Sequence, residues 1–279
     1  MERKIKLALI QYQIKPDWSE NVAIVESLLE QAKAEEADLA VLPEMFICPY
    51  ELELFPEYAE PIPEGRTCQL LRGWAEKLDL YILGGSLPER NQEGRLYNTA
   101  TLWDRQGNLQ AAHRKVHLFD VDLPGGVSFH ESTVLSPGEK ITVLDILGMR
   151  LGIAVCYDVR FPEIFRLMAL VGAEFVVLPG AFNNVSGPAH WELSLRARAV
   201  ENTIYVAGVS GTAPPGSSYQ SWGHTMMVDP FGEVLVNLEE AEGVGVVEVD
   251  PERIKDIRSR LPLLKQRRDD LYELRLLKS

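Results

Sequence analysis

The sequence predicts an α/β fold in which two mixed β-sheets pack together and are flanked by helices. Apolar strand patterns alternate with helical patterns along the chain, which is typical of α/β folds. Strand pairs joined by short turns interrupt this alternation, so we expect antiparallel as well as parallel pairing. The clearest unit is residues 151–163, where an apolar run ends at Cys156 and an amphipathic segment begins at Pro162. This pattern predicts a strand, a tight elbow and a helix.

Short runs of apolar residues predict the strands. They cover residues 5–12, 38–42, 81–87, 96–104, 109–114, 141–147, 149–155, 174–178, 203–209, 223–229, 233–237 and 243–249. Turn residues at 104–108, at Gly148 and at 230–232 join three neighbouring pairs into hairpins.

Apolar residues at helical spacing predict the helices. They cover residues 18–35, 67–78, 162–171 and 190–201, and a C-terminal helical tail begins at 251–258. Two long segments, 45–63 and 115–139, are predicted to be loops. Because long loops are usually functional or disordered, and the second holds aromatic and charged residues, we expect it to serve the functional site.

Composition excludes several classes of protein. The net charge of −13 disfavours nucleic acid and anionic membranes as partners. The three cysteines are an odd and low number, so we expect no disulfide framework and a reducing compartment. We find no apolar run long enough to span a membrane and no signal-peptide pattern, and we expect a cytoplasmic protein. With no linker or tandem repeat, residues 1–279 are predicted to form one domain.

Three predicted strands end in reactive groups. Glu44 follows the strand at 38–42, Lys115 follows the strand at 109–114, and Cys156 follows the strand at 149–155. Side chains at strand ends can meet on one rim of a sheet. A carboxylate, an ammonium and a thiol would together support acyl transfer. A helix N-terminus and nearby cations are expected to lower the pKa of the Cys156 thiol. Taken singly, each of these residue types is more often structural.

Several segments resemble the nitrilase superfamily of carbon–nitrogen hydrolases. The strongest are LPEMF (42–46), HRKVHLFDVDLPGG (113–126) and CYDVRFPE (156–163). Further similar segments are GGSLPE (84–89), LYNTA (96–100), PGAFN (179–183), GPAHWELSLRARAVEN (187–202), WGHTMMVDPFGE (222–233) and RRDDLY (267–272). The set extends over residues 5–273 and looks most like the omega-amidase branch of the superfamily.

The resemblance implies a four-layer α-β-β-α sandwich and a role for each matching residue. Glu44 is the implied general base, Lys115 the cation that stabilises the oxyanion, and Cys156 the nucleophile. Glu131 is the best match to a second glutamate that positions the lysine, and the backbone N–H of Tyr157 is the second oxyanion donor. Gly126 departs from the pattern, because omega-amidases often carry lysine there.

The resemblance also implies a substrate class, since omega-amidases cleave short monoamides of dicarboxylic acids such as 2-oxoglutaramate and 2-oxosuccinamate. Arg160 is our candidate for the substrate carboxylate, because a guanidinium binds carboxylates in a bidentate manner. Its alternative role is to pair with Asp158 or Glu163. The candidate wall residues are Tyr50, Phe129, Phe182 and His190.

Alternatives remain open at this point. Within the family, the chain could be an N-carbamoyl amino acid amidase or a deaminated-glutathione amidase. Outside catalysis, it could be an inactive binding protein on the same fold, or a redox sensor built on Cys156. We expect no cofactor and no metal, because the spacing of His113 and His117 matches no metal site and the glycine pairs match no nucleotide loop. The resemblance implies a homodimer or higher oligomer, with the tail at 251–279 as a candidate interface.

Overall fold

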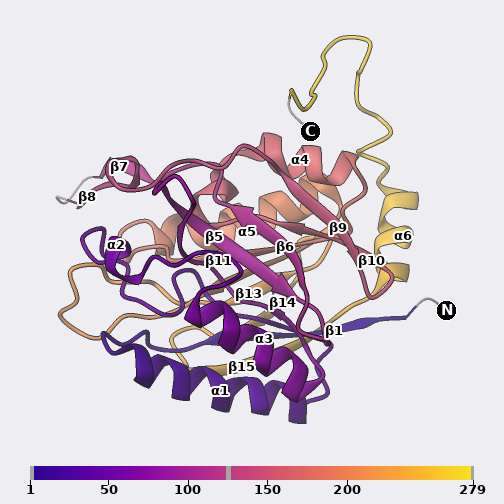
Figure 1. Ribbon diagram of the computed structural model, residues 1–279. Helices are drawn as coiled ribbons and strands as arrows, with labels where there is room; N and C mark the ends of the chain where they lie inside the picture. The colour runs from indigo at the N-terminus through magenta and orange to yellow at the C-terminus, as the bar shows by residue number, and fades with distance from the viewer. Residues whose placement is uncertain (1–2, 124–126, 278–279) are drawn as a thin grey trace.

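The computed structural model describes residues 3–123 and 127–277 (Figure 1). Two mixed β-sheets pack face to face, and helices cover their outer faces. The described chain therefore has four layers in the order helices, sheet, sheet, helices, and the predicted fold class is confirmed.

The first sheet has seven strands in the order β15-β1-β2-β3-β5-β4, and β6 pairs with β5. These strands are β1 (Ile5–Gln11), β2 (Leu39–Val41), β3 (Tyr81–Leu83), β4 (Leu87–Arg90), β5 (Leu96–Trp103), β6 (Leu109–Arg114) and β15 (Gly243–Val249). Because β1, β2 and β3 run parallel, their carboxyl ends meet at one edge of the sheet. The pairs formed by β15 with β1 and by β5 with β3 are antiparallel.

The second sheet has six strands in the order β14-β13-β12-β11-β10-β9. They are β9 (Thr142–Ile146), β10 (Met149–Ile153), β11 (Phe175–Gly180), β12 (Tyr205–Ser210), β13 (Met226–Val228) and β14 (Val234–Asn237). The pairs among β10, β11 and β12 are parallel, and the outer pairs are antiparallel. Within the predicted loop 115–139, β7 (Asp120–Leu123) and β8 (Val127–His130) form a separate hairpin.

The helices lie on the two outer sides of the sandwich, with α1 and α3 on one side and α4 and α5 on the other (Figure 1). Their bounds are α1 (Trp18–Ala34), α2 (Phe55–Tyr58), α3 (Arg66–Leu78), α4 (Pro162–Leu170), α5 (Gly187–Asn202) and α6 (Pro251–Arg260). Side-chain caps fix two of the starts, because Asp17 accepts from the N–H of Glu20 and Asp250 from that of Glu252.

The alternation of side chains in β1 explains why both of its faces are covered. Leu7 and Leu9 point into the core that also contains Leu151 of the second sheet. Ala8 and Ile10 point the other way and pack in the core built with the helices α1 and α3. A strand that is buried on both faces has a continuous apolar sequence, which is what residues 7–10 show.

Several predicted bounds were wrong. The predicted strand 81–87 is two strands, because the backbone turns at Gly85, where φ is +48°. The predicted loop 45–63 contains the short helix α2, and the predicted helix 190–201 already begins at Gly187. The predicted strand 223–229 is shortened to β13. The glycine at 126 lies outside the described residues.

After α6 the chain leaves the body of the molecule as an extended tail (Figure 1). The exposed fraction of Leu277 in this tail is 85%. Among residues 3–123 and 127–277, no helix is both long and apolar enough to cross a membrane.

Candidate active site

The ends of three strands bring Glu44, Lys115 and Cys156 together. Glu44 lies three residues after β2, Lys115 follows β6 directly, and Cys156 lies three residues after β10. The first two come from one sheet and Cys156 from the other, so the site lies where the ends of both sheets meet. All three side chains are buried, and Cys156 is 4% exposed.

Lys115 is the centre of the cluster. Its Nζ lies 3.1 Å from Oε1 of Glu44, 2.9 Å from Oε1 of Glu131 and 3.3 Å from the hydroxyl of Tyr50. Burial by itself lowers the pKa of Lys115, but the charges of Glu131 and Glu44 outweigh it and raise the pKa above its ordinary value. Lys115 therefore remains an ammonium, although water cannot reach it.

Glu131 holds this ammonium from the loop 115–139. Its Oε1 accepts from the hydroxyl of Tyr50 at 2.5 Å, and its Oε2 accepts from the backbone N–H of Phe119 at 2.7 Å. Tyr50, expected only as a wall of the pocket, thus contacts both carboxylates and the lysine. Phe129 stacks on Tyr50 with ring centroids 5.4 Å apart and supports it from β8.

Glu44 keeps one carboxylate oxygen available. Oε1 accepts from Nδ2 of Asn98 at 2.7 Å as well as from Lys115, whereas Oε2 is buried and accepts no hydrogen bond from an N–H or O–H group of the described residues. Burial raises the pKa of Glu44, the Lys115 charge lowers it and the Glu131 charge raises it, with a raised pKa as the result. A carboxylate with a raised pKa is a better general base at neutral pH.

Cys156 sits on a strained elbow at the start of the short 3-10 helix η2 (Cys156–Arg160). Its φ of +46° is a conformation that a residue with a side chain seldom adopts, and such strain is common at functional sites. The N–H of Ala181 donates to its Sγ at 3.5 Å. The N–H of Tyr157 belongs to the first turn of η2, where it has no partner within the helix.

The prediction that its surroundings lower the pKa of Cys156 was wrong for the resting site. Burial raises the pKa of the thiol well above its ordinary value, and the Glu44 charge raises it further, whereas Lys115 lowers it. The thiol is therefore neutral at rest, and it needs a base when it attacks a substrate.

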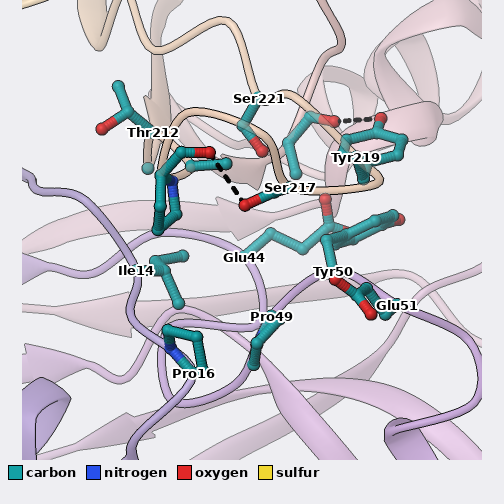
Figure 2. Close-up of a pocket in the computed structure, with 14 residues that line it drawn as sticks. Ile14, Pro16, Glu44, Pro49, Tyr50, Glu51, Thr212, Ser217, Tyr219 and Ser221 are labelled. Atoms are coloured by element: carbon teal, nitrogen blue, oxygen red, sulfur yellow. Dashed lines mark hydrogen bonds between the residues drawn. The ribbon is translucent and has the colours of Figure 1, made fainter.

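Two cavities adjoin the cluster. The Glu44 cavity lies under the loop 211–221, and its lining includes Glu44, Tyr50, Thr212, Ala213 and Ser217 (Figure 2). The Cys156 cavity is lined by Phe119, Cys156, Tyr157, Arg160, Ala181, Phe182, Ser186 and Tyr219. Ala181 and Tyr219 line both cavities and form the wall between them.

Arg160 lies in the Cys156 cavity, as its predicted role requires. Its guanidinium carbon is 4.8 Å from the centre of the Phe182 ring, and its Nη1 lies 3.0 Å from Nδ1 of His190. Its alternative role, pairing with Asp158 or Glu163, does not occur among the described ion pairs. His190 is exposed and does not line this cavity, so it supports Arg160 from outside.

Asp158 connects the turn at Cys156 to the segment that follows β6 and carries Lys115. It is completely buried, and it accepts from the N–H of Val155 at 2.9 Å and from the N–H of His117 at 2.9 Å. Nε2 of His113 lies 3.9 Å from Oδ2 of Asp158. The two histidines that flank Lys115 thus contact Asp158, and no group of metal-ligating side chains occurs in the described parts of the chain.

Sequence reasoning missed three groups at the site. They are Asn98, the backbone N–H of Ala181, and Tyr219, whose hydroxyl donates to the carbonyl of Ala181 at 2.5 Å. Asn98 and Ala181 lie inside the segments LYNTA and PGAFN, so the resemblance could have indicated them. Tyr219 lies in a Gly/Pro/Ser-rich loop and gave no signal.

The fold and the site define a hydrolase of carbon–nitrogen bonds. The pattern of the carbon–nitrogen hydrolase family matches residues 6–259, and the chain belongs to this family. It is 42% identical to omega-amidase NIT2 of Bos taurus over 98% of this chain and 99% of that protein. Its identity to omega-amidase NIT2 of Homo sapiens is also 42%, over 98% of each protein. The chain is thus an omega-amidase-like amidohydrolase, which confirms the resemblance found in the sequence.

Solved structures agree with this placement. Nit3 of Saccharomyces cerevisiae, a member of branch 10 of the nitrilase superfamily, has a TM-score of 0.88 at 39% identity and covers 95% of this chain and 97% of its own. An amidase from Nesterenkonia sp. has a TM-score of 0.77 at 28% identity, over 96% of this chain and 94% of its own.

Proposed function

We propose that the protein is an omega-amidase that hydrolyses a short monoamide of a dicarboxylic acid, such as 2-oxoglutaramate or 2-oxosuccinamate. The observation that carries this proposal is the buried Lys115, held between Glu44 and Glu131 beside the Cys156 thiol. A base, a cation and a nucleophile in one dry site are the groups that amide cleavage through a thioester needs. The full-length similarity to omega-amidases supports this substrate class.

In the first half-reaction, Sγ of Cys156 attacks the amide carbon while Glu44 takes the thiol proton. The negative charge then develops on the carbonyl oxygen, where the ammonium of Lys115 and the N–H of Tyr157 stabilise it. Loss of one such donor typically costs about 10²–10³ in kcat. When the tetrahedral intermediate collapses, the C–N bond breaks, ammonia leaves with the proton from Glu44, and a thioester remains.

Arg160 supplies the specificity in this proposal. A dicarboxylic monoamide has a free carboxylate at the end opposite its amide, and Arg160 is the cation of the Cys156 cavity outside the Lys115 cluster. The ring of Phe182 lies against the guanidinium, whose planar fork of N–H groups suits a carboxylate. Phe182 and Phe119 then enclose the carbon chain between the two polar ends.

The direct test is ammonia release from 2-oxoglutaramate by the purified protein and by the variant Cys156→Ala. We expect turnover by the parent and none by the variant, with Cys48→Ala as the control because Cys48 is a buried thiol outside both cavities. Without turnover by the parent, the omega-amidase proposal is wrong. Carbamoyl amino acids, deaminated glutathione and simple nitriles would then be tested in the same assay.

Selective alkylation separates the enzyme from an inactive binding protein on the same fold. In the proposed enzyme, iodoacetamide modifies Cys156 ahead of Cys48 and Cys68, and the pH profile of that modification shifts when Lys115 is replaced. A protein that neither turns over an amide nor shows this selectivity would be a binding protein. Modification of Cys156 by low peroxide without amide turnover would indicate a redox sensor.

We also propose that residues 1–279 act as one cytoplasmic domain that assembles into a homodimer or higher oligomer. Support comes from large apolar side chains that the described chain leaves in solvent, including Leu193 on α5, which is 67% exposed, and Leu277 in the tail. Light scattering on the parent and on Leu193→Glu tests the assembly, and we expect the molar mass of the variant to fall.

A further inference from the structure

The two cavities at the active site differ in their access to water. The Glu44 cavity runs from the completely buried Glu44 to Pro16, which is exposed, and to Ser217, which is half-buried in the loop 211–221 (Figure 2). Most of the lining of the Cys156 cavity is buried, with Tyr157 and Arg160 half-buried. The lining of the Glu44 cavity therefore contains more residues that solvent reaches than the lining of the Cys156 cavity does.

The wall between the cavities is a single hydrogen-bonded contact. The hydroxyl of Tyr219 donates to the carbonyl of Ala181 at 2.5 Å, and the N–H of Ala181 donates to Sγ of Cys156. The Tyr219 ring also packs against Tyr50, with centroids 4.7 Å apart. The loop 211–221 is thus connected to the nucleophile through a single residue, Ala181.

The hydrogen bonds of Glu44 show which of its oxygens can act on water. Oε1 is occupied by Asn98, Lys115 and Tyr50. Oε2 is buried and accepts no hydrogen bond from an N–H or O–H group of the described residues, and Glu44 lines the cavity that extends to the exposed Pro16. A buried carboxylate oxygen without a donor is costly unless a water or a substrate proton satisfies it.

We propose that the Glu44 cavity is the compartment that supplies the hydrolytic water, whereas the Cys156 cavity holds the acyl group. This inference rests on the proposed function, because there the acyl chain extends from Sγ of Cys156 toward Arg160 and occupies the Cys156 cavity, whose present volume of about 10 Å³ has to widen to admit it. Water then reaches the thioester carbon from the opposite side of the Tyr219–Ala181 wall, past Glu44.

In this arrangement Glu44 accepts one proton and later returns it during the second half-reaction. A water molecule forms a C–O bond to the thioester carbon while Oε2 of Glu44 takes one of its protons. The C–S bond then breaks, and Glu44 returns the proton to the thiolate of Cys156, so the free acid leaves and the thiol is regenerated. The ammonia released in the first half-reaction leaves through the Glu44 cavity before the water molecule enters it.

Filling the Glu44 cavity tests the proposal. Ala213 lines this cavity but not the Cys156 cavity, and it is half-buried, so Ala213→Leu and Ala213→Trp form a graded series. Ala34→Trp is the matched control, because Ala34 is exposed at the end of α1. Ammonia from 2-oxoglutaramate is measured after an acid quench, both in a single turnover and in steady state, and intact-protein mass spectrometry detects the acylated chain.

We expect the single-turnover rate of ammonia release to stay near that of the parent. Steady-state kcat should fall about 100-fold, the lower end of the ~10²–10⁴-fold that general acid–base catalysis typically contributes. The acyl adduct on Cys156 should then accumulate, to a smaller extent with leucine than with tryptophan, and Ala34→Trp should behave as the parent.

Two results would overturn the inference. Unchanged kcat in a folded Ala213→Trp would mean that water arrives elsewhere. An equal fall in single-turnover and steady-state rates, with no adduct, would mean that the Glu44 cavity binds the amide itself. Absence of turnover by the parent is a separate outcome, which rejects the proposed function rather than the route of water.

Discussion

Nζ of Lys115 lies 2.9 Å from Oε1 of Glu131, and both side chains are completely shielded from solvent. A buried charge is tolerated only when it is paired and hydrogen-bonded. Since Glu44 has to accept and release protons during the reaction, Glu131 is the partner that can remain an anion throughout. Glu131 therefore fixes both the charge and the position of Lys115.

Replacing Glu131 by glutamine keeps the shape of the side chain and removes its charge. We expect Glu131→Gln to lower kcat about 100-fold with little change in KM, because a small displacement of a catalytic group can cost that much. The control is Glu60→Gln, since Glu60 is a buried carboxylate that accepts from the N–H groups of Thr67 and Cys68 at the start of α3. That variant should lose stability but keep its kcat, whereas equal kcat for Glu131→Gln and the parent would remove Glu131 from the mechanism.

The apolar runs predicted most of the fold because a strand or helix that is buried on one or both faces needs such a pattern. The break at Gly85 was not predictable, since the sequence YILGGSL has the same apolar pattern with or without a turn. The hairpin of β7 and β8 was missed because each of its strands is only four residues long.

Part of the active site could be predicted from the positions of the strands. Glu44, Lys115 and Cys156 follow strands, and strand ends meet in a sheet. The pKa of Cys156 was predicted in the wrong direction because burial, which dominates it, depends on how completely the surrounding loops close. Tyr219 depends on the same closure, so local sequence contained no signal for it.

Arg160 should determine preference for anionic amides. We expect Arg160→Lys to raise KM for 2-oxoglutaramate about 10- to 100-fold, since hydrogen bonds to charged groups contribute ~1.5–3 kcal/mol. Butyramide, an uncharged amide, should be hydrolysed by the variant as by the parent. Arg196→Lys is the control, because Arg196 forms an exposed ion pair with Glu192 on the same helix as His190. Equal effects on both substrates would show that Arg160 is structural.

Asp158 links stability to pH. Burial raises the pKa of this carboxyl, but the neighbouring His113 ring and the hydrogen bonds from His117 and from the N–H of Val155 outweigh it and hold the pKa below the ordinary value of 3.8. A lowered pKa in the folded state means that the stabilisation is fully present above pH 3.8 and is lost as pH falls below it.

The measurement for Asp158 is the melting temperature between pH 7 and pH 3. We expect Asp158→Asn to melt several degrees lower than the parent at pH 7, because it removes a buried charge that several donors contact. The difference between the two proteins should narrow toward pH 3, because below pH 3.8 the carboxyl takes up a proton in the unfolded parent while it stays ionised in the folded parent. A difference that stays constant over this range would contradict the assigned role.

Gly85 positions the general base through the backbone. Its φ is +48°, and a Cβ at this residue would lie 2.0 Å from the carbonyl oxygen of Pro43, the residue before Glu44. We therefore expect Gly85→Ala to displace the end of β2, to lower the melting temperature and to reduce kcat by at least tenfold. Gly94→Ala is the matched control, because Gly94 also has a positive φ, +80°, with no atom within 4 Å of an added Cβ. Strain at φ alone costs about 1–2 kcal/mol, so Gly94→Ala should lose a little stability and keep its activity. If both variants keep full activity, the close approach at Pro43 does not control the position of Glu44.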